Sequence, residues 1–276
     1  HYHPNILVIN NIEFDHADIF ENIDSVVKNF HHLVRIVPKN GKIIYNYDDK
    51  NIKKLIKKGI WSKEISMTSK NYKDANWSLS QKGNSFFLSN IKTKNSGSKI
   101  IESSLLGIHN YKNISLAILA SMQAGVSLSI CIDAIKKFKG VKRRMEEVES
   151  KGTLKIYDDF AHHPTEIESS IKSLKENFKR EKILSICEIK SHSMISGAHK
   201  KDLPIALNNS HYSIIIKPPL LKWALNSTRK NLYVVDSYAK AIKVIKKIEN
   251  EIDIILIMSN KSTVNIRGYI KNDKNK

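Results

Sequence analysis

The sequence is poor in cysteine and has no long uninterrupted apolar run. Its 276 residues include two cysteines, Cys131 and Cys187. They are too few and too unpatterned for a disulfide framework or a zinc cluster, and we expect both in apolar cores. No run approaches the roughly 18 to 20 apolar residues that span a bilayer. The N-terminus has neither the charged region nor the small-residue cleavage site of a secretory signal. These absences favour a cytoplasmic protein that does not cross a membrane.

Several common chemical motifs are also missing. The sequence has no serine nucleophile elbow, no Cys-x-x-Cys pair and no Gly-x-Gly-x-x-Gly fingerprint. It also has no Gly-x-x-x-x-Gly-Lys-Ser/Thr loop, whose backbone amides cradle the phosphates of ATP. Any ATP chemistry would therefore need a phosphate cradle that these residues do not encode.

Arginine is scarce although the formal net charge is +19. Six of the 46 basic residues are arginine, and the lysines are scattered over nearly every segment. Clustered basic residues neutralise the phosphates of nucleic acids. Scattered lysines, such as those within residues 53–58, fall at helical spacing on solvated faces instead. The distribution therefore disfavours nucleic acid as a partner.

Residues 1–140 show a mixed pattern of strands and helices. Short apolar runs at residues 5–10 and 42–46 predict buried strands, and the alternation between residues 64 and 106 predicts short antiparallel strands. The helices expected in this part lie at about residues 18–34, 49–58, 110–124 and 128–138. Gly140 is the expected C-terminal cap of the last helix, and we place a hinge at residues 140–143.

Residues 141–276 alternate regularly between apolar strands and helices, which predicts an α/β domain with a parallel, doubly wound sheet. The expected strands are residues 154–157, 183–187, 213–216, 232–235 and 252–258, and the expected helices are residues 164–178, 201–208 and 238–249. Ligands of such sheets bind at the carboxyl ends of the strands. The residues just after Tyr157, Cys187 and Met258 are therefore site candidates.

The densest group of ionisable side chains spans Asp158, Asp159, His162 and His163, between an expected strand and an expected helix. Two acids and two imidazoles could bind a metal, move protons or hold a nucleotide. The structural alternative is a helix cap in which an aspartate accepts backbone N–H bonds and Pro164 occupies the first turn. Four ionisable groups exceed what a cap needs, which favours a functional role.

Three further segments could carry chemistry. Residues 10–18 place carboxylates beside His16, a combination that suits Mg²⁺ or, alternatively, a loop with a helix cap. Residues 107–110 bring His109 and Asn110 to a helix start, where an amide can read an adenine edge or cap the helix. Residues 140–144 offer arginine at the expected hinge, where a guanidinium can clamp phosphate or carboxylate.

The order of these segments, together with Phe30-His-His-Leu-Val-Arg35, resembles the Mur ligases, and within them the muropeptide-recycling members. The resemblance runs from Tyr2 to about Gly268. It implies residues 1–140 as the C-terminal portion of the central ATP-binding domain and residues 141–276 as the Rossmann-like C-terminal domain. It also implies ATP-dependent joining of a recovered L-Ala-γ-D-Glu-meso-diaminopimelate tripeptide to UDP-N-acetylmuramate through an acyl phosphate, with Mg²⁺.

The same resemblance implies roles for individual residues. His16 resembles a ligand of Mg²⁺, and His109 and Asn110 resemble contacts to the nucleotide base. Arg144 resembles the hinge arginine that reaches ATP, and Asp159 resembles the acid that contacts the ribose. His162 lies beside them and is a candidate catalytic residue. The residues expected to meet the peptide substrate are Glu188, Lys190, Ser191, Met194 and Asn260.

The sequence departs from the family pattern at three places. The phosphate loop is absent, Lys190 stands where the family has arginine, and Lys261-Ser-Thr-Val-Asn265 replaces a glycine-rich turn. We therefore expect the chain to be inactive alone and to need a separately encoded N-terminal half. The alternatives are a relic or binding module that holds nucleotide or peptide, a basic nucleic-acid-binding protein and, least favoured, a metal-dependent hydrolase.

Overall fold

A computed structural model describes residues 2–70, 72–93, 97–151, 154–219, 221–225 and 229–272. The chain forms two compact units. The first comprises His1–Phe14 and Ile19–Lys139, and the second comprises Asp15–Asp18 and Gly140–Lys276. Each unit is built around its own six-stranded sheet, which confirms the predicted α/β class. None of the helices in the described part of the chain has the length and apolar character needed to cross a membrane.

The first sheet follows the order of the chain, from β1 to β6. Its strands are β1 (Ile6–Ile9), β2 (Lys42–Asn46), β3 (Lys63–Thr68), β4 (Trp77–Lys82), β5 (Ser85–Asn90) and β6 (Lys99–Ile101). The prediction of antiparallel strands from residue 64 onward is wrong for β3, which pairs parallel with both β2 and β4. The reason is the helix between β2 and β3, which returns the chain to the same end of the sheet. The antiparallel expectation is correct for β4, β5 and β6.

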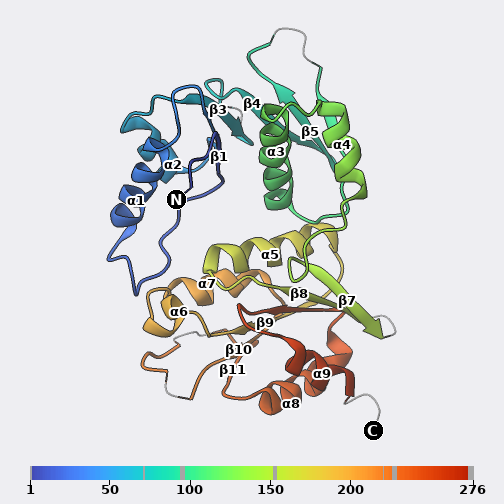
Figure 1. Ribbon diagram of the computed structural model, residues 1–276. Helices are drawn as coiled ribbons and strands as arrows, with labels where there is room; N and C mark the ends of the chain where they lie inside the picture. Colours follow the sequence, from blue (N-terminus) through green and yellow to red (C-terminus); the bar gives the residue numbers. More distant parts are fainter. Residues whose placement is uncertain are drawn as a thin grey trace. The chain divides into compact units, whose positions relative to one another are not determined.

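Helices cover both faces of the first sheet: α1 (Ile23–Arg35), α2 (Lys50–Lys57), α3 (Ile108–Gln123) and α4 (Leu128–Lys137) (Figure 1). Successive residues of β2 point to opposite faces. Ile43 packs in one apolar cluster with residues of α1 and α2, and Ile44 packs in the other with residues of α3 and α4. This alternation makes the unit three layers thick.

The start of α1 differs from the prediction. The helix begins at Ile23 rather than near residue 18, because Asn22 is its N-cap. The Asn22 side chain accepts a hydrogen bond from the backbone N–H of Ser25, and the Ser25 hydroxyl group accepts one from the N–H of Asn22. This reciprocal pair satisfies two amides that have no partner within the helix. The residues between β1 and Asn22 therefore form a loop.

The second sheet has the order β11-β10-β9-β12-β8-β7. Its strands are β7 (Glu146–Lys151), β8 (Leu154–Asp159), β9 (Ile183–Glu188), β10 (Tyr212–Ile216), β11 (Leu232–Val235) and β12 (Ile254–Met258). The strands from β8 to β12 pair parallel, as predicted, whereas the edge strand β7 is antiparallel to β8. The sequence did not predict β7, because its charged residues show no clear apolar alternation.

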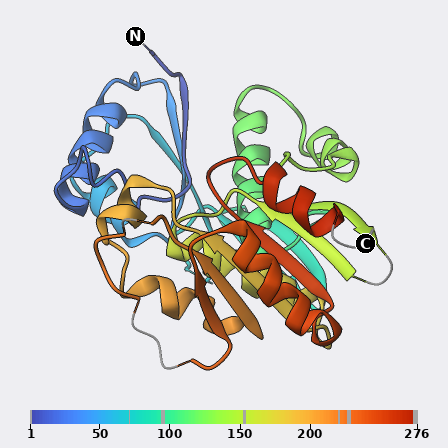
Figure 2. The same ribbon diagram turned by 90° about the horizontal axis from the view of Figure 1, so that it is seen from below.

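The second sheet is covered by α5 (Pro164–Asn177), α6 (His192–Ser196) and α7 (Asp202–Ala206) on one face and by α8 (Tyr238–Ile248) and α9 (Val264–Asn272) on the other (Figures 1 and 2). Helices on both faces confirm the doubly wound prediction. The sequence did not predict α6 and α9. Every residue of β12 is buried, as expected for a central parallel strand covered on both sides.

Gly197, which ends α6, is the basis of a stability prediction. It has a φ of +82°, and a β-carbon added there would lie 2.9 Å from Cδ1 of Trp223. The indole of Trp223 also donates a hydrogen bond to the carbonyl oxygen of Met194, at 3.0 Å. Gly197→Ala should therefore lower the free energy of unfolding by about 1 to 3 kcal/mol, measured by urea denaturation.

Gly268→Ala is the matched control. Gly268 lies in α9, and in the described part of the chain no atom beyond its chain neighbours and its own helix backbone lies within 4 Å of the β-carbon that alanine would add. Because alanine is the better helix former, this change should leave stability equal or slightly higher. A similar loss in both variants would contradict the steric argument at Gly197.

Candidate functional site

The strongest candidate site lies at the carboxyl edge of the second sheet. Asp159 at the end of β8 and Cys187 near the end of β9 flank Met258 at the end of β12, so three strands finish side by side. Three acidic side chains, those of Asp158, Asp159 and Glu188, are buried where these strands end. A buried carboxylate must be hydrogen-bonded or paired. The partners of each acid therefore show what it does.

Asp158 is held by residues that follow β12 and by the domain-boundary arginine. Its carboxylate accepts a hydrogen bond of 2.6 Å from the Thr263 hydroxyl group. The guanidinium groups of Arg143 and Arg267 lie 3.7 and 3.6 Å from the same oxygen. Asp158 is fully buried, so its role is structural: its contacts connect the end of β8 to the start of α9.

Asp159 is buried in a different environment, because consecutive strand residues face opposite sides. It accepts hydrogen bonds from the Ala161 N–H, at 3.1 Å, and from the Ser170 hydroxyl group of α5, at 2.8 Å. Burial raises the pKa of the Asp159 carboxyl group, against the effect of these hydrogen bonds. Its predicted contact with the ribose stays a proposal, since Asp159 is only 4% exposed.

The two neighbouring arginines have different environments. The guanidinium of Arg143 donates to the carbonyl oxygens of Ser259 and Lys261, which fixes the loop after β12. The side chain of Arg144 is 51% exposed, lies 5.2 Å from the centre of the Phe160 ring and is 3.9 Å from Glu166. Arg144 is therefore the member of the pair that presents its guanidinium to solvent.

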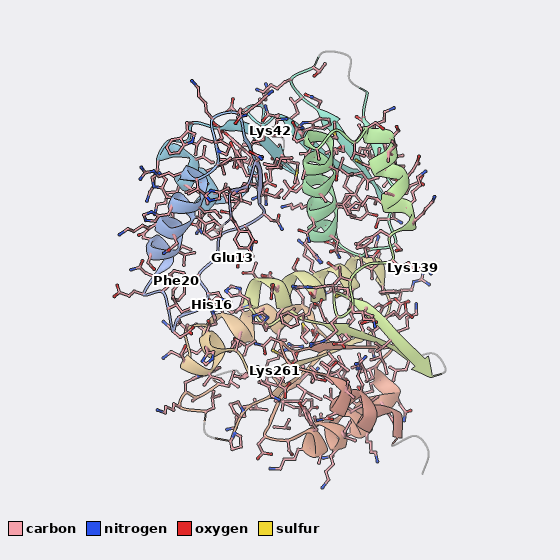
Figure 3. The ribbon with its side chains drawn as sticks, in the orientation of Figure 1. Glu13, His16, Phe20, Lys42, Lys139 and Lys261 are labelled. Carbon is pink, nitrogen blue, oxygen red and sulfur yellow. The ribbon has the colours of Figure 1, made fainter. Side chains whose placement is uncertain are left out.

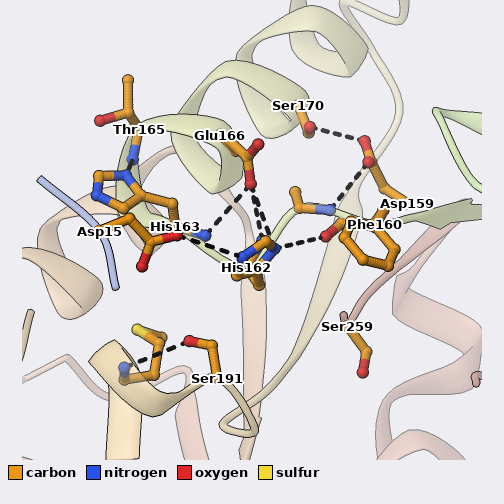
Figure 4. Close-up of polar contacts among 12 residues, drawn as sticks. Asp15, Asp159, Phe160, His162, His163, Thr165, Glu166, Ser170, Ser191 and Ser259 are labelled. Carbon is orange, nitrogen blue, oxygen red and sulfur yellow. Dashed lines mark hydrogen bonds and ion pairs between the residues drawn. The ribbon is translucent and has the colours of Figure 1, made fainter. Parts of the chain in front are cut away.

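Figure 4 shows His162 and the turn between β8 and α5. Nδ1 of His162 lies 3.0 Å from the carbonyl oxygen of Phe160. Because a carbonyl oxygen only accepts, Nδ1 carries the proton in this contact. Nε2 then faces Asp15, at 3.9 Å. His162 is therefore oriented by the backbone and has its second nitrogen directed at a carboxylate.

The structural alternative supposed that an aspartate caps the helix in this turn, but the cap is a histidine. His163 is the N-cap of α5, and its ring accepts a hydrogen bond from the Thr165 N–H, while Pro164 occupies the first turn as expected. Glu166 completes the cap by accepting from the His163 N–H. His163 and Glu166 are thus used in capping, whereas His162 and Asp159 are not needed for it.

His16 lies in the loop that leads to α1 (Figure 3), within the four residues that group with the second unit. Its φ of 54° is unusual for a residue with a side chain, and its N–H donates to the carboxylate of Asp15, at 2.8 Å. The Ser193 hydroxyl group also donates to Asp15. Burial raises the pKa of Asp15, but these hydrogen bonds outweigh it and the pKa is lowered.

The predicted Mg²⁺ site fits this geometry only in part. Within the described residues, no group of three or more His, Cys, Asp or Glu side chains is placed to hold a metal ion. His16 would thus have at most one such side chain beside it as a further ligand. Mg²⁺ commonly keeps water and takes phosphate oxygens as ligands, so one or two side chains are compatible with a phosphate-bound ion but not with a site made by this chain alone.

Four of the predicted peptide-binding residues lie at or just after the end of β9 and the fifth, Asn260, follows β12, but not all are accessible. Glu188 accepts hydrogen bonds from Tyr238 and Ser259 and lies 2.8 Å from Nζ of Lys190. Ser191 caps α6 through the N–H of Met194. Met194 is buried, so its side chain cannot meet a ligand in this arrangement.

The loop after β12 holds its shape without the glycine-rich turn of the family. The hydroxyl groups of Ser259 and Thr263 turn inward to Glu188 and Asp158. Lys261, labelled in Figure 3, and Ser262 are exposed. Within the described residues the buried Oδ1 atom of Asn260 has no hydrogen-bond partner, and because the atom is covered, the predicted contact of Asn260 with the peptide stays a prediction.

The first unit contains the predicted contacts to the nucleotide base, in the first turn of α3. The N-cap is Gly107, without a side-chain hydrogen bond, so capping by His109 or Asn110 is wrong. The Asn110 amide donates to the carbonyl oxygen of Leu106, at 2.8 Å, and Asn10 after β1 donates to the side chain of Asn113, at 2.6 Å. His109 and Asn110 keep their base-binding role as a prediction.

The sequence did not single out Arg143 on its own, nor Tyr238, Ser259 and Thr263, all of which shape the carboxyl edge. The hydrogen bonds that their side chains donate at this edge span 50 to 118 residues of sequence. No local pattern signals such contacts.

Comparisons with known proteins agree with this architecture. The Mur ligase middle domain matches residues 1–121, and the Mur ligase glutamate ligase domain matches residues 143–261. The chain is 30% identical over 269 residues to a UDP-N-acetylmuramate–L-alanyl-γ-D-glutamyl-meso-2,6-diaminoheptandioate ligase of Haemophilus influenzae, which covers 95% of this chain and 58% of that protein. It is 33% identical over 226 residues to the Escherichia coli ligase of the same name, covering 81% of this chain and 48% of that protein.

A solved structure shows the same relation. The crystal structure of a murein peptide ligase from Psychrobacter arcticus aligns with 98% of this chain and 57% of that one, at 28% identity and a TM-score of 0.72. The chain spans about half the length of the curated relatives it matches. Both domain matches and the identity over nearly the whole chain lead to one conclusion: the chain belongs to the Mur ligase family.

Proposed function

We propose that this chain forms the middle and C-terminal domains of an ATP-dependent ligase of peptidoglycan recycling. The ligase would join L-Ala-γ-D-Glu-meso-diaminopimelate to UDP-N-acetylmuramate, with residues 1–140 in the middle domain and residues 141–276 in the C-terminal domain. The observation that carries the proposal is the match of 95% and 81% of the chain to two curated ligases with this substrate pair in their names. Because ATP and UDP-sugars are cytoplasmic metabolites, we place the reaction in the cytoplasm.

In the proposed reaction a muramic acid carboxylate attacks the γ-phosphate of ATP, which gives an acyl phosphate and ADP. The amine of the tripeptide then attacks the acyl carbon and releases phosphate. Mg²⁺, when bound, would neutralise charge on the phosphates. From this chain His16 would hold the ion, and Arg144 would contact ATP with its exposed guanidinium. His109 and Asn110 would contact the base, and Asp159 the ribose.

His162 would act close to the reacting groups. Its Nδ1 atom is fixed by the Phe160 carbonyl oxygen, and its Nε2 atom faces Asp15. An imidazole oriented in this way can hold or pass a proton at Nε2. We propose that it takes part in proton movement when the peptide amine attacks.

The test is complementation. The purified 276-residue chain should release no ADP from ATP, because it contains no phosphate loop and phosphoryl transfer depends on that positioning. Mixing it with a fragment of the Escherichia coli ligase that carries the UDP-binding domain and the phosphate loop should give ADP release that depends on the tripeptide. The Escherichia coli fragment without this chain is the control. Turnover by the chain alone would contradict the expected inactivity, and no turnover in the mixture at saturating ATP and Mg²⁺ would count against a ligase function.

A second candidate is a binding module without catalysis. The exposed ammonium group of Lys190 favours it, since a lysine can bind a carboxylate as a single charge without the forked geometry of an arginine. Titration calorimetry distinguishes the binding module from the ligase. Binding of ADP or tripeptide without complementation would favour the module, whereas restored turnover would exclude it.

A further inference from the structure

Glu188 is the centre of a hydrogen-bond network at the end of β9. Its Oε1 atom accepts from the hydroxyl group of Tyr238, at 2.6 Å, and lies 2.8 Å from Nζ of Lys190. Its Oε2 atom accepts from the hydroxyl group of Ser259, at 2.8 Å. Glu188 is 6% exposed, and both of its oxygens are used within the protein. It is therefore poorly placed to receive a positively charged group of a ligand.

Lys190, in contrast, can still donate. Its ammonium group has three N–H donors. One faces Glu188, and another donates to the hydroxyl oxygen of Tyr238, at 3.4 Å. The described residues offer no further partner, and the side chain is 41% exposed. The remaining N–H can therefore meet a negatively charged group from outside the protein.

Tyr238 connects the two charged residues. Its phenol donates to Glu188 and accepts from Lys190, and its ring centre lies 5.8 Å from the lysine Nζ. Tyr238 is the first residue of α8. The N-cap Ser237 accepts a hydrogen bond from the Lys240 N–H, so the backbone that carries the Tyr238 ring is fixed by the helix cap. A tyrosine placed there limits the directions that the flexible lysine stem can take.

We propose that Tyr238 is a positioning residue that, with Glu188, orients the Lys190 ammonium group to bind a carboxylate of the incoming peptide. The inference rests on the proposed function for the identity of the peptide. An arginine fork would orient a carboxylate by its own planar geometry, whereas a lysine is a single charge on a flexible stem. The Tyr238–Glu188 pair supplies the orientation that the lysine lacks.

The charge on Lys190 agrees with this arrangement. Partial burial by itself lowers the pKa of Lys190, but the hydrogen bonds and charge interactions with Glu188 and Tyr238 outweigh it, and the pKa is raised. Burial and the hydrogen bond to Glu188 also raise the pKa of Tyr238, so its phenol keeps the proton that it donates. Removing the phenol oxygen should therefore change the lysine pKa as well as its position.

The experiment uses Tyr238→Phe in the full 276-residue chain. The lysine pKa is followed by NMR with ¹³Cε-labelled lysine, and Lys190→Arg identifies the resonance by its loss. The pKa of Lys190 should fall toward its ordinary value. Affinity for L-Ala-γ-D-Glu-meso-diaminopimelate, measured by titration calorimetry, should fall about tenfold, on the scale of one hydrogen bond to a charged group. In the complemented ligase the KM for the tripeptide should rise while kcat stays the same.

Tyr212→Phe is the matched control. Tyr212 also donates to a glutamate, Glu251, but it is the first residue of β10, at the opposite end of the strands. This variant should change neither the Lys190 pKa nor the tripeptide affinity. An unchanged lysine pKa and unchanged affinity in Tyr238→Phe would overturn the inference. A wild-type chain that binds no tripeptide, with the pKa response intact, would instead overturn the proposed peptide substrate, and the carboxylate assignment with it.

Discussion

Asp158→Ala is expected to lower the free energy of unfolding by about 3 to 5 kcal/mol, the range for breaking a buried ion pair by removing one partner. Asp158 is fully buried, and its carboxylate is surrounded by the hydroxyl group of Thr263 and the guanidinium groups of Arg143 and Arg267. Its removal would leave two cations, each about one quarter exposed, without their shared carboxylate. Urea denaturation followed by circular dichroism measures the change.

The control for this prediction is Asp236→Ala. Asp236 also pairs with a cation, Lys240, but both side chains are on the surface. Surface pairs contribute little to stability because water already solvates both charges. Equal losses in the two variants would mean that burial of Asp158 does not determine its effect.

Arg144→Ala is expected to leave the free energy of unfolding almost unchanged while reducing tripeptide-dependent ADP release of the complemented ligase by about 10²- to 10³-fold. That is the usual cost of losing one donor that stabilises developing charge. The side chain is half exposed, lies 3.9 Å from Glu166 and has its guanidinium 5.2 Å from the centre of the Phe160 ring. Its charge is thus available to a nucleotide. The measurements are urea denaturation and steady-state ADP release.

Arg143→Ala provides the matched comparison. Arg143 donates to the carbonyl oxygens of Ser259 and Lys261, and its loss should cost about 1 to 3 kcal/mol of stability because these acceptors lose a charged partner. If Arg144→Ala lost stability and kept turnover, while Arg143→Ala did the reverse, the assignment of the two arginines would be wrong.

Much of the fold follows from local patterning. The apolar runs that predicted β2, β9 and β12 need no distant information, because a buried strand shows in its own residues. The elements that the sequence did not predict lack such a local signal. The short helix α6 has only five residues, too few to show a helical period, and β7 is a charged edge strand. The parallel pairing of β3 depends on the crossover through α2, which an alternating pattern does not reveal.

The candidate site was predictable in position but not in the division of roles. The rule that ligands bind at the carboxyl ends of strands led to the residues after Tyr157, Cys187 and Met258, and the buried polar network lies there. The sequence could not show that Met194 points inward, because burial of one side chain depends on what packs over it. Nor could it show that Glu188 is already occupied by Tyr238 and Ser259.

The sequence by itself determined the α/β class, the doubly wound C-terminal sheet and, through the order of its motifs, the resemblance to Mur ligases. Only the tertiary structure decided which of two adjacent arginines anchors a loop and which faces solvent, and which buried acid serves folding. The physical reason is distance along the chain. The hydrophobic period can be seen in neighbouring residues, whereas the Ser259 carbonyl group that Arg143 binds lies 116 residues away and meets it only after the sheet has formed.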